Sequence, residues 1–205
     1  MAGKFIVIDG MDGSGKTTQI MKIVNYIFKK DKRNHVVLTR EPYKSTDGLE
    51  IRRLLGESKD PMEKGYKLAD LFVNDRKFHI KEVIEPALAE GLYVVSDRYK
   101  YSTLAYQQTQ GVPLEKLMEM HKTLLVPDLT LIFDVSAEIA MQRMSKDAIR
   151  GKKEVFEQLE FQAKLRHNYL ALKDQLPNEN IVIVDASKSI DEVFSQLKAE
   201  VDKIL

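Results

Sequence analysis

Nine residues near the amino terminus have the types and the spacing that hold a chain of phosphates. They are Gly10-Met11-Asp12-Gly13-Ser14-Gly15-Lys16-Thr17-Thr18. Glycines can adopt positive φ and leave room for a ligand, so that successive backbone N–H groups converge on phosphate oxygens. Lys16 would place its charge at the β- and γ-phosphates, and Thr17 would offer a hydroxyl to Mg²⁺. The segment therefore predicts a phosphate-binding loop.

The residues on both sides of this loop fit that prediction. Residues 5–8 are apolar and largely β-branched, as in a buried strand, and residues 17–29 carry isoleucines and a valine at helical spacing. Such a helix would direct its free N–H groups and the positive end of its dipole at a bound anion. The alternative, a glycine-rich turn that binds nothing, does not require both flanking elements.

Charged residues follow two more apolar runs that predict strands. In parallel sheets with helical crossovers, ligands bind at the carboxyl ends of strands. Arg40 and Arg98 are therefore candidate anion ligands, and Asp97 could orient Mg²⁺ beside the phosphate loop. Ion pairs between neighbours would explain the same residues, with Arg40 bound to Glu41 at the surface. Asp97 would then pair with Arg98 at the end of its strand.

Two residues in a long helical region, residues 63–89, could contact a nucleobase. Phe72 and Arg76 are four apart and share a helical face, where a ring can stack and a guanidinium can donate hydrogen bonds. Packing plus a surface charge is the simpler interpretation of the same pair. Pro86 is expected to kink or end this helix.

The composition favours one domain spanning residues 1–205. The chain is 43% hydrophobic and carries a formal net charge of +1, so it has no general excess of basic residues for binding nucleic acid. It has no cysteine, which excludes disulfides and zinc thiolate sites. No apolar run approaches the ~20 residues of a membrane span. We expect a cytoplasmic protein.

The order of the predicted elements gives the fold class. Five apolar strands alternate with helices, which predicts an α/β fold with a five-stranded parallel sheet and helices on both faces. The strands are expected at residues 5–8, 35–39, 92–96, 129–135 and 181–184. Most of the candidate polar residues follow strand ends and would meet at one edge of the sheet.

These parts together suit phosphoryl transfer, which needs a phosphate loop, a metal ligand and positive charge for the transferred group. A GTP-binding switch is disfavoured because the chain has no Asn-Lys-x-Asp sequence for reading guanine. Metal hydrolase chemistry is disfavoured because the four histidines are scattered without paired ligand spacing. A nucleoside kinase and a non-catalytic nucleotide-binding module remain as alternatives.

The chain resembles the thymidylate kinase family over nearly its full length. The segments that carry the resemblance are residues 9–19, Arg40-Glu41-Pro42, Phe72 with Asp75-Arg76, Asp97-Arg98-Tyr99 with Ser102 and Ala105-Tyr106-Gln107, and Pro127-Asp128-Leu129. The resemblance implies a P-loop nucleoside monophosphate kinase that transfers the γ-phosphoryl group of ATP to dTMP, with Mg²⁺. It also implies a homodimer formed through the helices after the first and third strands.

The resemblance further implies roles for single residues at the acceptor. Arg40 and Arg98 would hold the phosphate of dTMP. Phe72 would stack on thymine, and Arg76 would hydrogen-bond a base carbonyl. Asp12 would approach the 3′-hydroxyl of the sugar.

Other side chains would complete the two nucleotide sites by the same resemblance. Tyr106 would close the space beneath the deoxyribose and disfavour a 2′-hydroxyl, with Gln107 near the base. Ser102 would contribute to the choice of acceptor. The residues that would serve ATP and its metal are Lys16, Thr17 and Asp97.

Residues 143–153 are polar and rich in cations, which makes them a candidate lid over a bound triphosphate, although a solvated loop would have the same composition. Some members of the family carry a basic residue inside the phosphate loop, and others place the catalytic cation in the lid. Because this chain has Gly13 at that loop position, Arg150 is the first choice for the lid cation. The next choices are Arg143, Lys152 and Lys153. Lysine there lacks the two-pronged donor set of the second arginine that many such lids have.

Overall fold

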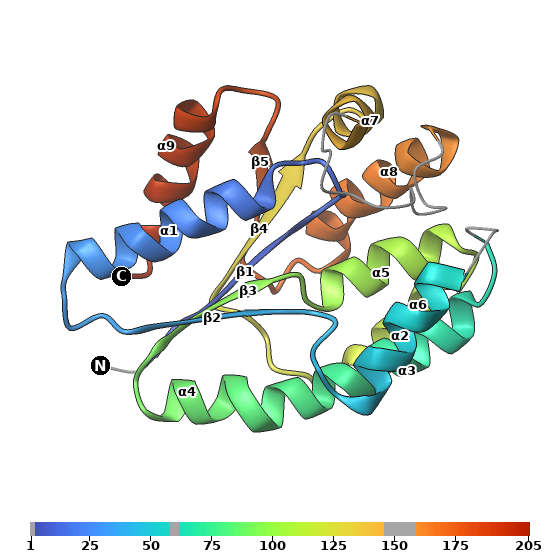
Figure 1. Cartoon of the computed structure of the whole chain (residues 1–205), viewed down its shortest axis with the longest axis horizontal. Coiled ribbons are helices and arrows are strands. Elements are labelled where there is room, and N and C mark those ends of the chain that lie inside the picture. The colour runs from blue at the N-terminus through green and yellow to red at the C-terminus, as the bar shows by residue number, and fades with distance from the viewer. Residues whose placement is uncertain (1–2, 58–61, 146–158) are drawn as a thin grey trace.

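The structure, a computed structural model, describes residues 3–57, 62–145 and 159–205 of the chain. Five parallel strands form one sheet in the order β2-β3-β1-β4-β5 (Figure 1). Their bounds are β1 Phe5–Gly10, β2 Val36–Arg40, β3 Tyr93–Asp97, β4 Leu129–Asp134 and β5 Ile181–Asp185. The predicted α/β fold with a five-stranded parallel sheet is confirmed.

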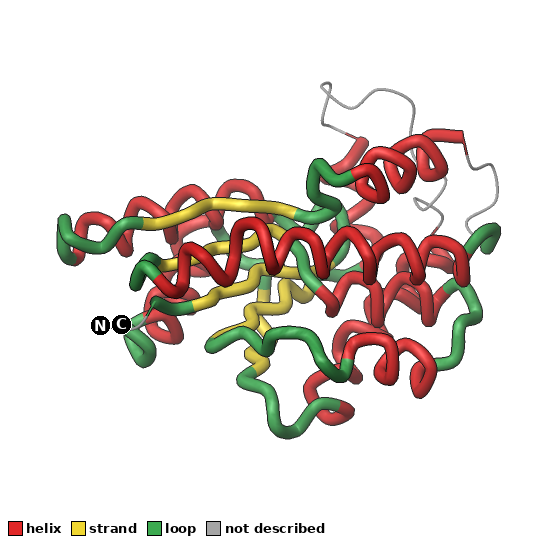
Figure 2. The backbone as a smooth tube through the Cα atoms, turned by 90° about the horizontal axis from the view of Figure 1, so that it is seen from below, coloured by secondary structure: helices red, strands yellow, loops and turns green. Residues whose placement is uncertain are grey.

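Helices connect the strands and cover both faces of the sheet. Their bounds are α1 Lys16–Lys30, α2 Thr46–Glu57, α3 Gly65–His79, α4 Glu85–Ala89, α5 Lys100–Thr109, α6 Leu114–His121, α7 Ala137–Ser145, α8 Leu159–Gln175 and α9 Ile190–Val201. α1 and α9 pack on one face, whereas α4, α5 and α8 pack on the other (Figures 1 and 2). Right-handed crossovers between parallel strands give this arrangement.

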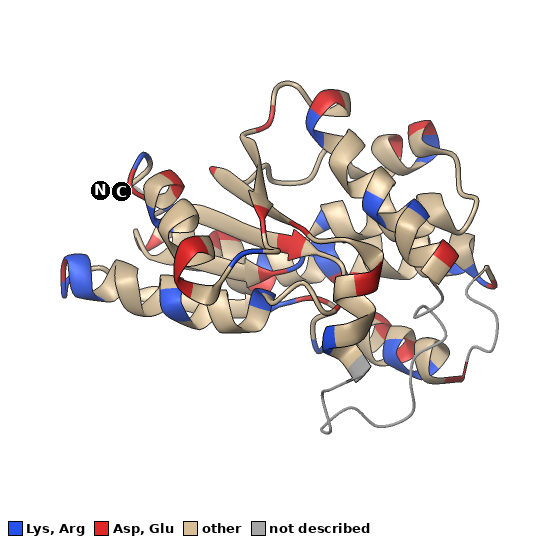
Figure 3. Cartoon of the chain, turned by 90° about the horizontal axis from the view of Figure 1, so that it is seen from above, with Lys and Arg blue, Asp and Glu red and all other residues tan. Residues whose placement is uncertain are grey.

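The core lies along the central strand β1. Every residue of β1 is buried, because helices cover it from both faces and β3 and β4 flank it. Burying a large aliphatic side chain such as Ile6 or Ile8 stabilises the fold by roughly 1.5–3 kcal/mol. The edge strand β2 is only partly covered, and its Leu38 is exposed. Basic and acidic residues are interspersed along the outer helices (Figure 3).

One long helical region joins β2 to β3, and Pro86 neither ends it nor stops its hydrogen bonding. α3 passes through a π-helical segment, η1 (Ile80–Ile84), directly into α4. Proline has no N–H and its ring excludes the carbonyl four residues back, which disfavours regular α-helix there. In the wider turn the N–H of Glu85 donates to the carbonyl of Ile80, five residues back. The helix ends at Ala89, and Gly91 just beyond it has a φ of +77°.

The carboxyl ends of the strands lie at one end of the molecule, away from both chain termini (Figure 1). α1 begins there after the loop of residues 11–15 that follows β1, and α5 begins there soon after β3. α2, α3 and α8 extend beyond the same edge (Figure 1). The loops that follow β1, β2 and β3 therefore meet where the sequence placed the candidate site.

Candidate active site

The loop after β1 has the backbone of a phosphate cradle. Three glycines in it have positive φ: Gly10 (139°), Gly13 (78°) and Gly15 (92°). The N–H and the hydroxyl of Ser14 both donate to the carbonyl of Met11, at 3.3 and 2.7 Å, and close the turn. Because α1 starts at Lys16, its unpaired N–H groups and the positive end of its dipole adjoin this loop.

α7 fixes one side of the loop. A Cβ atom built on Gly13 would lie 2.3 Å from the carbonyl oxygen of Ala140, so backbone atoms leave no space for a side chain at this position. Arg143, one turn further along α7, donates from Nη1 to the carbonyl of Ala186 at 3.1 Å and to that of Ser14 at 3.5 Å. Arg143 therefore lies at the phosphate loop. The candidate lid residues Arg150, Lys152 and Lys153 lie outside the described residues.

The ammonium group of Lys16 is held inside the loop. It donates to the carbonyls of Gly10 and Met11 at 2.9 and 2.8 Å. Burial, and next the charge of Arg98, lower the pKa of Lys16 from 10.5 to about 8, against the raising effect of nearby aspartates. A buried cation on carbonyl oxygens is a strong binding point for a phosphate, because an anion would relieve its desolvation.

Arg98 faces the same loop from the end of β3. Its Nη2 donates to Asp12 at 2.8 Å, and its Nη1 donates to Ser102 at 2.8 Å. The ring of Tyr106 lies 5.4 Å from the guanidinium carbon. The alternative in which Arg98 pairs with Asp97 is wrong, because its guanidinium pairs with Asp12 of the phosphate loop at 2.8 Å and lies 3.8 Å from Asp9.

Asp9, to which the sequence reasoning gave no role, organises this corner. Its carboxylate is fully buried and accepts five hydrogen bonds. The donors are the N–H groups of Gly10, Tyr99 and Ser102 and the hydroxyls of Ser102 and Tyr169. These donors belong to the phosphate loop, to the start of α5 and to α8. One carboxylate therefore holds three elements together.

Asp97 has an oxygen available for a metal. Its Oδ1 atom is buried and has no hydrogen-bond partner among the described residues, which is costly for a carboxylate unless a cation or water is bound. Thr17 is exposed in the first turn of α1. Within residues 3–57, 62–145 and 159–205, no group of three acidic or histidine side chains could hold a metal ion. A metal at Asp97 and Thr17 would therefore take other ligands from phosphates and water.

Arg40 is exposed at the end of β2, in register with Asp97 of β3. Its side chain makes no hydrogen bond or ion pair with the part of the chain that the structure describes. The alternative that pairs Arg40 with Glu41 is wrong, because Glu41 is buried and binds two other side chains, Arg76 and His79. Arg40 is thus free to meet an anion.

The simpler interpretation of the sequence, in which Arg76 is a surface charge, is wrong. It is 1% exposed, and its Nε donates to Glu41 at 2.7 Å. Its terminal nitrogens contact Nε2 of His121 at 2.8 Å and the hydroxyl of Thr103 at 3.1 Å. Arg76 thus joins β2, α5 and α6 through one buried guanidinium.

The hydrogen bonds fix the proton position on His121. Arginine only donates and a carbonyl only accepts, so Nε2 accepts from Arg76 while Nδ1 donates to the carbonyl of Leu117 at 2.6 Å. Burial, and next the charge of Arg76, lower the pKa of His121 to about 3. The ring is therefore neutral at every pH at which the protein would work.

Replacing Glu41 tests this buried network. Glu41→Gln removes the charge that compensates Arg76, and we expect the free energy of unfolding to fall by about 3 kcal/mol or more. Denaturant unfolding measures this change. Asp191→Asn is the control, because Asp191 pairs with Lys22 while its own side chain is almost fully exposed, and it should change stability little. Equal effects in both variants would contradict the importance of the Glu41 pair.

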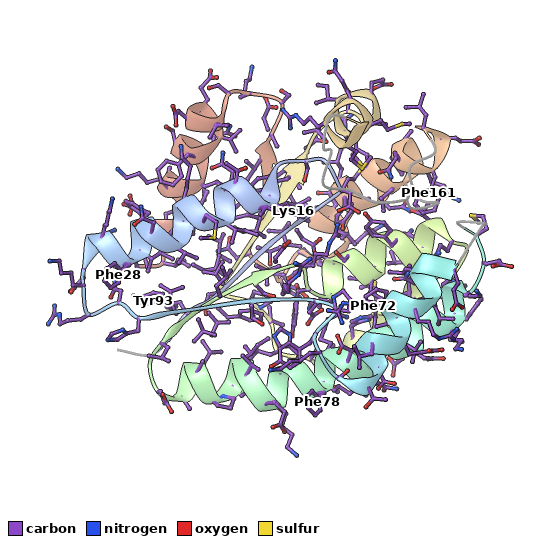
Figure 4. All side chains as sticks on the ribbon, in the orientation of Figure 1. Lys16, Phe28, Phe72, Phe78, Tyr93 and Phe161 are labelled. Atoms are coloured by element: carbon purple, nitrogen blue, oxygen red, sulfur yellow. The ribbon has the colours of Figure 1, made fainter. Side chains whose placement is uncertain are left out.

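The remaining predicted contacts lie around the same end of the sheet. Phe72 is half-buried on α3, one turn before Arg76, and packs on a small apolar cluster with α2. Figure 4 shows Lys16 where β1 passes into α1 and Phe72 on the side of α3 nearer the strand ends. Gln107 is buried on α5, and its Oε1 has no partner among the described residues.

Comparison of the sequence with known proteins identifies the family. The sequence model of the thymidylate kinase family matches residues 8–197. The chain belongs to the thymidylate kinase family. It is 40% identical over 203 residues to a probable thymidylate kinase of Pyrococcus horikoshii, covering 97% of this chain and 96% of that protein. It is 36% identical over 209 residues to the thymidylate kinase of Caldicellulosiruptor saccharolyticus, covering 100% and 98%.

As a member of this family the chain is a kinase. None of the helices in the described residues is both long enough and apolar enough to cross a lipid bilayer.

Two residues of the site, Asp9 and Tyr169, were missed by the sequence reasoning. A carboxylate ending an otherwise apolar strand, directly before the phosphate loop, is a signal that could have identified Asp9. Tyr169 stands among ordinary helical residues and gives no such signal.

Proposed function

We propose that this member of the family transfers the γ-phosphoryl group of ATP to the phosphate of dTMP, giving dTDP and ADP. One observation carries the proposal: Arg98, directly after β3, donates from Nη2 to Asp12 of the phosphate loop at 2.8 Å, beside the loop carbonyls that hold the ammonium of Lys16. Asp12, bound to Arg98, stands beside both. Two cation sites this close, supplied by separate strand ends, suit two phosphate groups brought together for transfer.

The donor would bind along the phosphate loop. We assign the backbone N–H groups from Gly10 to Thr18 and the ammonium of Lys16 to the phosphates of ATP. Arg143 already lies at this loop and would add a charge at its far side. Asp97 and Thr17 would hold Mg²⁺. The Oδ1 atom of Asp97, which is buried without a hydrogen-bond partner among the described residues, supports that assignment. When bound, Mg²⁺ would neutralise charge on the β- and γ-phosphates.

The acceptor would bind between the ends of β2 and β3. Arg98 is oriented by its partners, and Arg40 is free to turn toward the phosphate of dTMP. Asp12 would accept a hydrogen bond from the 3′-hydroxyl once the phosphate takes its place at Arg98. Tyr106, beneath the guanidinium, would fill the space under the deoxyribose.

The base would lie toward α3 and α5. Phe72 would stack on thymine, with Gln107 and Ser102 nearby. The contacts of Arg76 with Glu41, His121 and Thr103 leave one N–H of Nη1 for a base carbonyl. Its neighbours hold Arg76 rigidly, which supports a role in reading a fixed base edge.

A test of the reaction is an ADP-release assay that offers each nucleoside and each nucleoside monophosphate in turn, with ATP and Mg²⁺. We expect dTMP to be the best acceptor. Turnover of thymidine without turnover of dTMP would favour a nucleoside kinase. ATP binding without any turnover would favour a nucleotide-binding module. Either result would overturn the proposal.

ATP binding should take up protons near pH 8.5. The triphosphate favours the charged form of Lys16, whose pKa is about 8 in the free protein, so binding should raise this pKa. At pH 8.5 most free molecules carry neutral Lys16, and we expect uptake of roughly half a proton or more on binding. Calorimetric titrations in buffers of different ionisation enthalpy measure it.

The pH dependence gives this prediction its control. At pH 6.5 Lys16 is already protonated, so uptake by this group should approach zero. Proton uptake that does not rise between pH 6.5 and 8.5 would contradict the assignment.

The lowered pKa of Lys16 also affects the stability of the unliganded protein. Between about pH 8 and 10.5 the unfolded chain binds more protons at Lys16 than the folded chain does. The contribution of Lys16 to the free energy of unfolding therefore increases with pH in that window.

We also propose that the chain acts as a homodimer in the cytoplasm, as the family resemblance implies. α1 offers apolar surface for an interface, since Met21 and Phe28 are exposed on it. α5 is almost entirely covered by its own chain, so of the two described helices between β3 and β4, α6 has more surface to contribute. Sedimentation at several protein concentrations would measure the assembly.

A further inference from the structure

The hydroxyl of Tyr169 lies where the phosphate loop and the acceptor arginine meet. Tyr169 is buried on α8, and its hydroxyl oxygen is 2.9 Å from Oδ1 of Asp9. The same oxygen is 3.1 Å from the hydroxyl of Ser102 and 3.4 Å from Nη1 of Arg98. A phenol from a distant helix thus reaches the guanidinium for which we propose contact with dTMP.

The chemistry of the four groups settles most of their proton positions. The carboxylate of Asp9 only accepts, and each hydroxyl has one proton to donate. Ser102 donates to Asp9 at 2.6 Å, and Tyr169 donates to the same Oδ1 atom at 2.9 Å. Both hydroxyl oxygens then turn their lone pairs toward Nη1 of Arg98. The two hydroxyls therefore lie between the carboxylate of Asp9 and the guanidinium, which stay 3.8 Å apart.

The backbone of Arg98 shows that this position is constrained. Its φ is +74°, in the left-handed region that costs a non-glycine residue on the order of 1–2 kcal/mol. The N–H of Arg98 donates to the carbonyl of Ile8, and its carbonyl accepts from the hydroxyl of Ser96. Such strain persists where surrounding contacts impose it, and it is common at binding sites.

We propose that Tyr169 is a positioning residue for acceptor binding: with Ser102 it spaces Arg98 from Asp9 and aims the guanidinium at the acceptor phosphate. This inference rests on the proposed function. Nη1 of Arg98 is only 3.8 Å from Oδ1 of Asp9. Without the phenol hydroxyl, Asp9 lacks one donor and Nη1 lacks one acceptor, so the two ions can close on each other. The guanidinium then turns from the acceptor toward the protein interior.

Tyr169→Phe removes only the hydroxyl. We expect the KM for dTMP to rise about five- to twentyfold, the loss that follows from one weakened charged hydrogen bond. The KM for ATP should change less than about threefold, because the phosphate loop keeps its own bonds to Lys16. Steady-state kinetics with each substrate varied in turn, and calorimetric binding of dTMP, measure the split.

Tyr101→Phe is the matched control. Tyr101 is also fully buried, and its hydroxyl donates to a carboxylate, that of Glu179, at 2.5 Å. Both variants lose a buried phenol–carboxylate hydrogen bond, and both should melt at a lower temperature. Only Tyr169→Phe should raise the KM for dTMP. Equal KM values for dTMP in Tyr169→Phe and the parent protein would show a purely structural role and would overturn the proposal.

A double variant separates this proposal from the proposed function. In an Arg98→Ala background, Tyr169→Phe should raise the KM for dTMP no further, because the group that it positions is gone. Full additivity of the two effects would overturn the positioning role. If Arg98→Ala alone leaves dTMP binding unchanged, the assignment of Arg98 under the proposed function fails instead.

Ser102→Ala is a second variant that tests the positioning of Arg98 if Tyr169→Phe does not fold. It removes the other hydroxyl between Asp9 and Arg98, and the same rise in the KM for dTMP is expected without a rise in the KM for ATP. An unchanged KM for dTMP in Ser102→Ala would contradict the positioning of Arg98 by the two hydroxyls.

Discussion

Lys16→Ala is expected to lower kcat by about a thousandfold or more. Its ammonium lies in the phosphate loop, where it donates to two carbonyls, and burial destabilises its charged form. A preorganised cation of this kind acts most strongly on charge that develops during transfer, and removing one such group costs at least two to three orders of magnitude. Rapid-quench or coupled assays at saturating ATP and dTMP would measure the loss.

Lys29→Ala is the control for this change. Lys29 lies on the same helix but is exposed in its last turn, so the variant should keep nearly full activity. Thermal melts of both variants separate lost chemistry from lost folding. If Lys16→Ala kept more than about a tenth of the parent kcat, the phosphate loop would not be the donor site.

Arg98→Ala should raise the KM for dTMP about a hundredfold. A guanidinium aimed at a phosphate offers two charge-assisted hydrogen bonds, each of which contributes about 1.5–3 kcal/mol when buried. ATP binding should stay nearly intact. Because Arg98 lowers the pKa of Lys16, its removal leaves Lys16 more fully protonated above pH 8, which favours the triphosphate.

Arg98→Lys provides the matched comparison. It keeps the charge but loses the planar pair of donors, so it should fall between the parent protein and Arg98→Ala in acceptor binding. Calorimetric titration with a non-hydrolysable ATP analogue checks the donor site separately. Loss of ATP binding in Arg98→Ala would contradict the assignment of this residue to the acceptor.

The fold could be predicted from local patterns because each element carries its own signal. The five apolar runs and the glycine loop before α1 agree with the structure. Pro86 is the instructive exception. Its missing N–H does disfavour an α-helical turn, but η1 accommodates it with a longer hydrogen bond, and nothing local distinguishes that outcome from a helix end.

The candidate site was predictable only where residue type and strand position coincide. Lys16 and Arg98 follow strand ends and meet as expected. The network of Glu41, Arg76 and His121 was not predictable, because its members come from three distant segments and each resembles a surface residue in sequence. Burial of charge depends on partners that only the tertiary fold brings together.

The π-helical segment sets the rotational phase between two halves of one helix. Each residue of a regular helix advances the side-chain direction by about 100°, and the wider turn at η1 holds one residue more than a regular turn. α4 can therefore aim Ala87 at the sheet while α3 aims Phe72 and Arg76 at the strand ends. If the same residues formed a regular α-helix without this wider turn, α3 would be rotated by about a quarter turn relative to the half that covers β3.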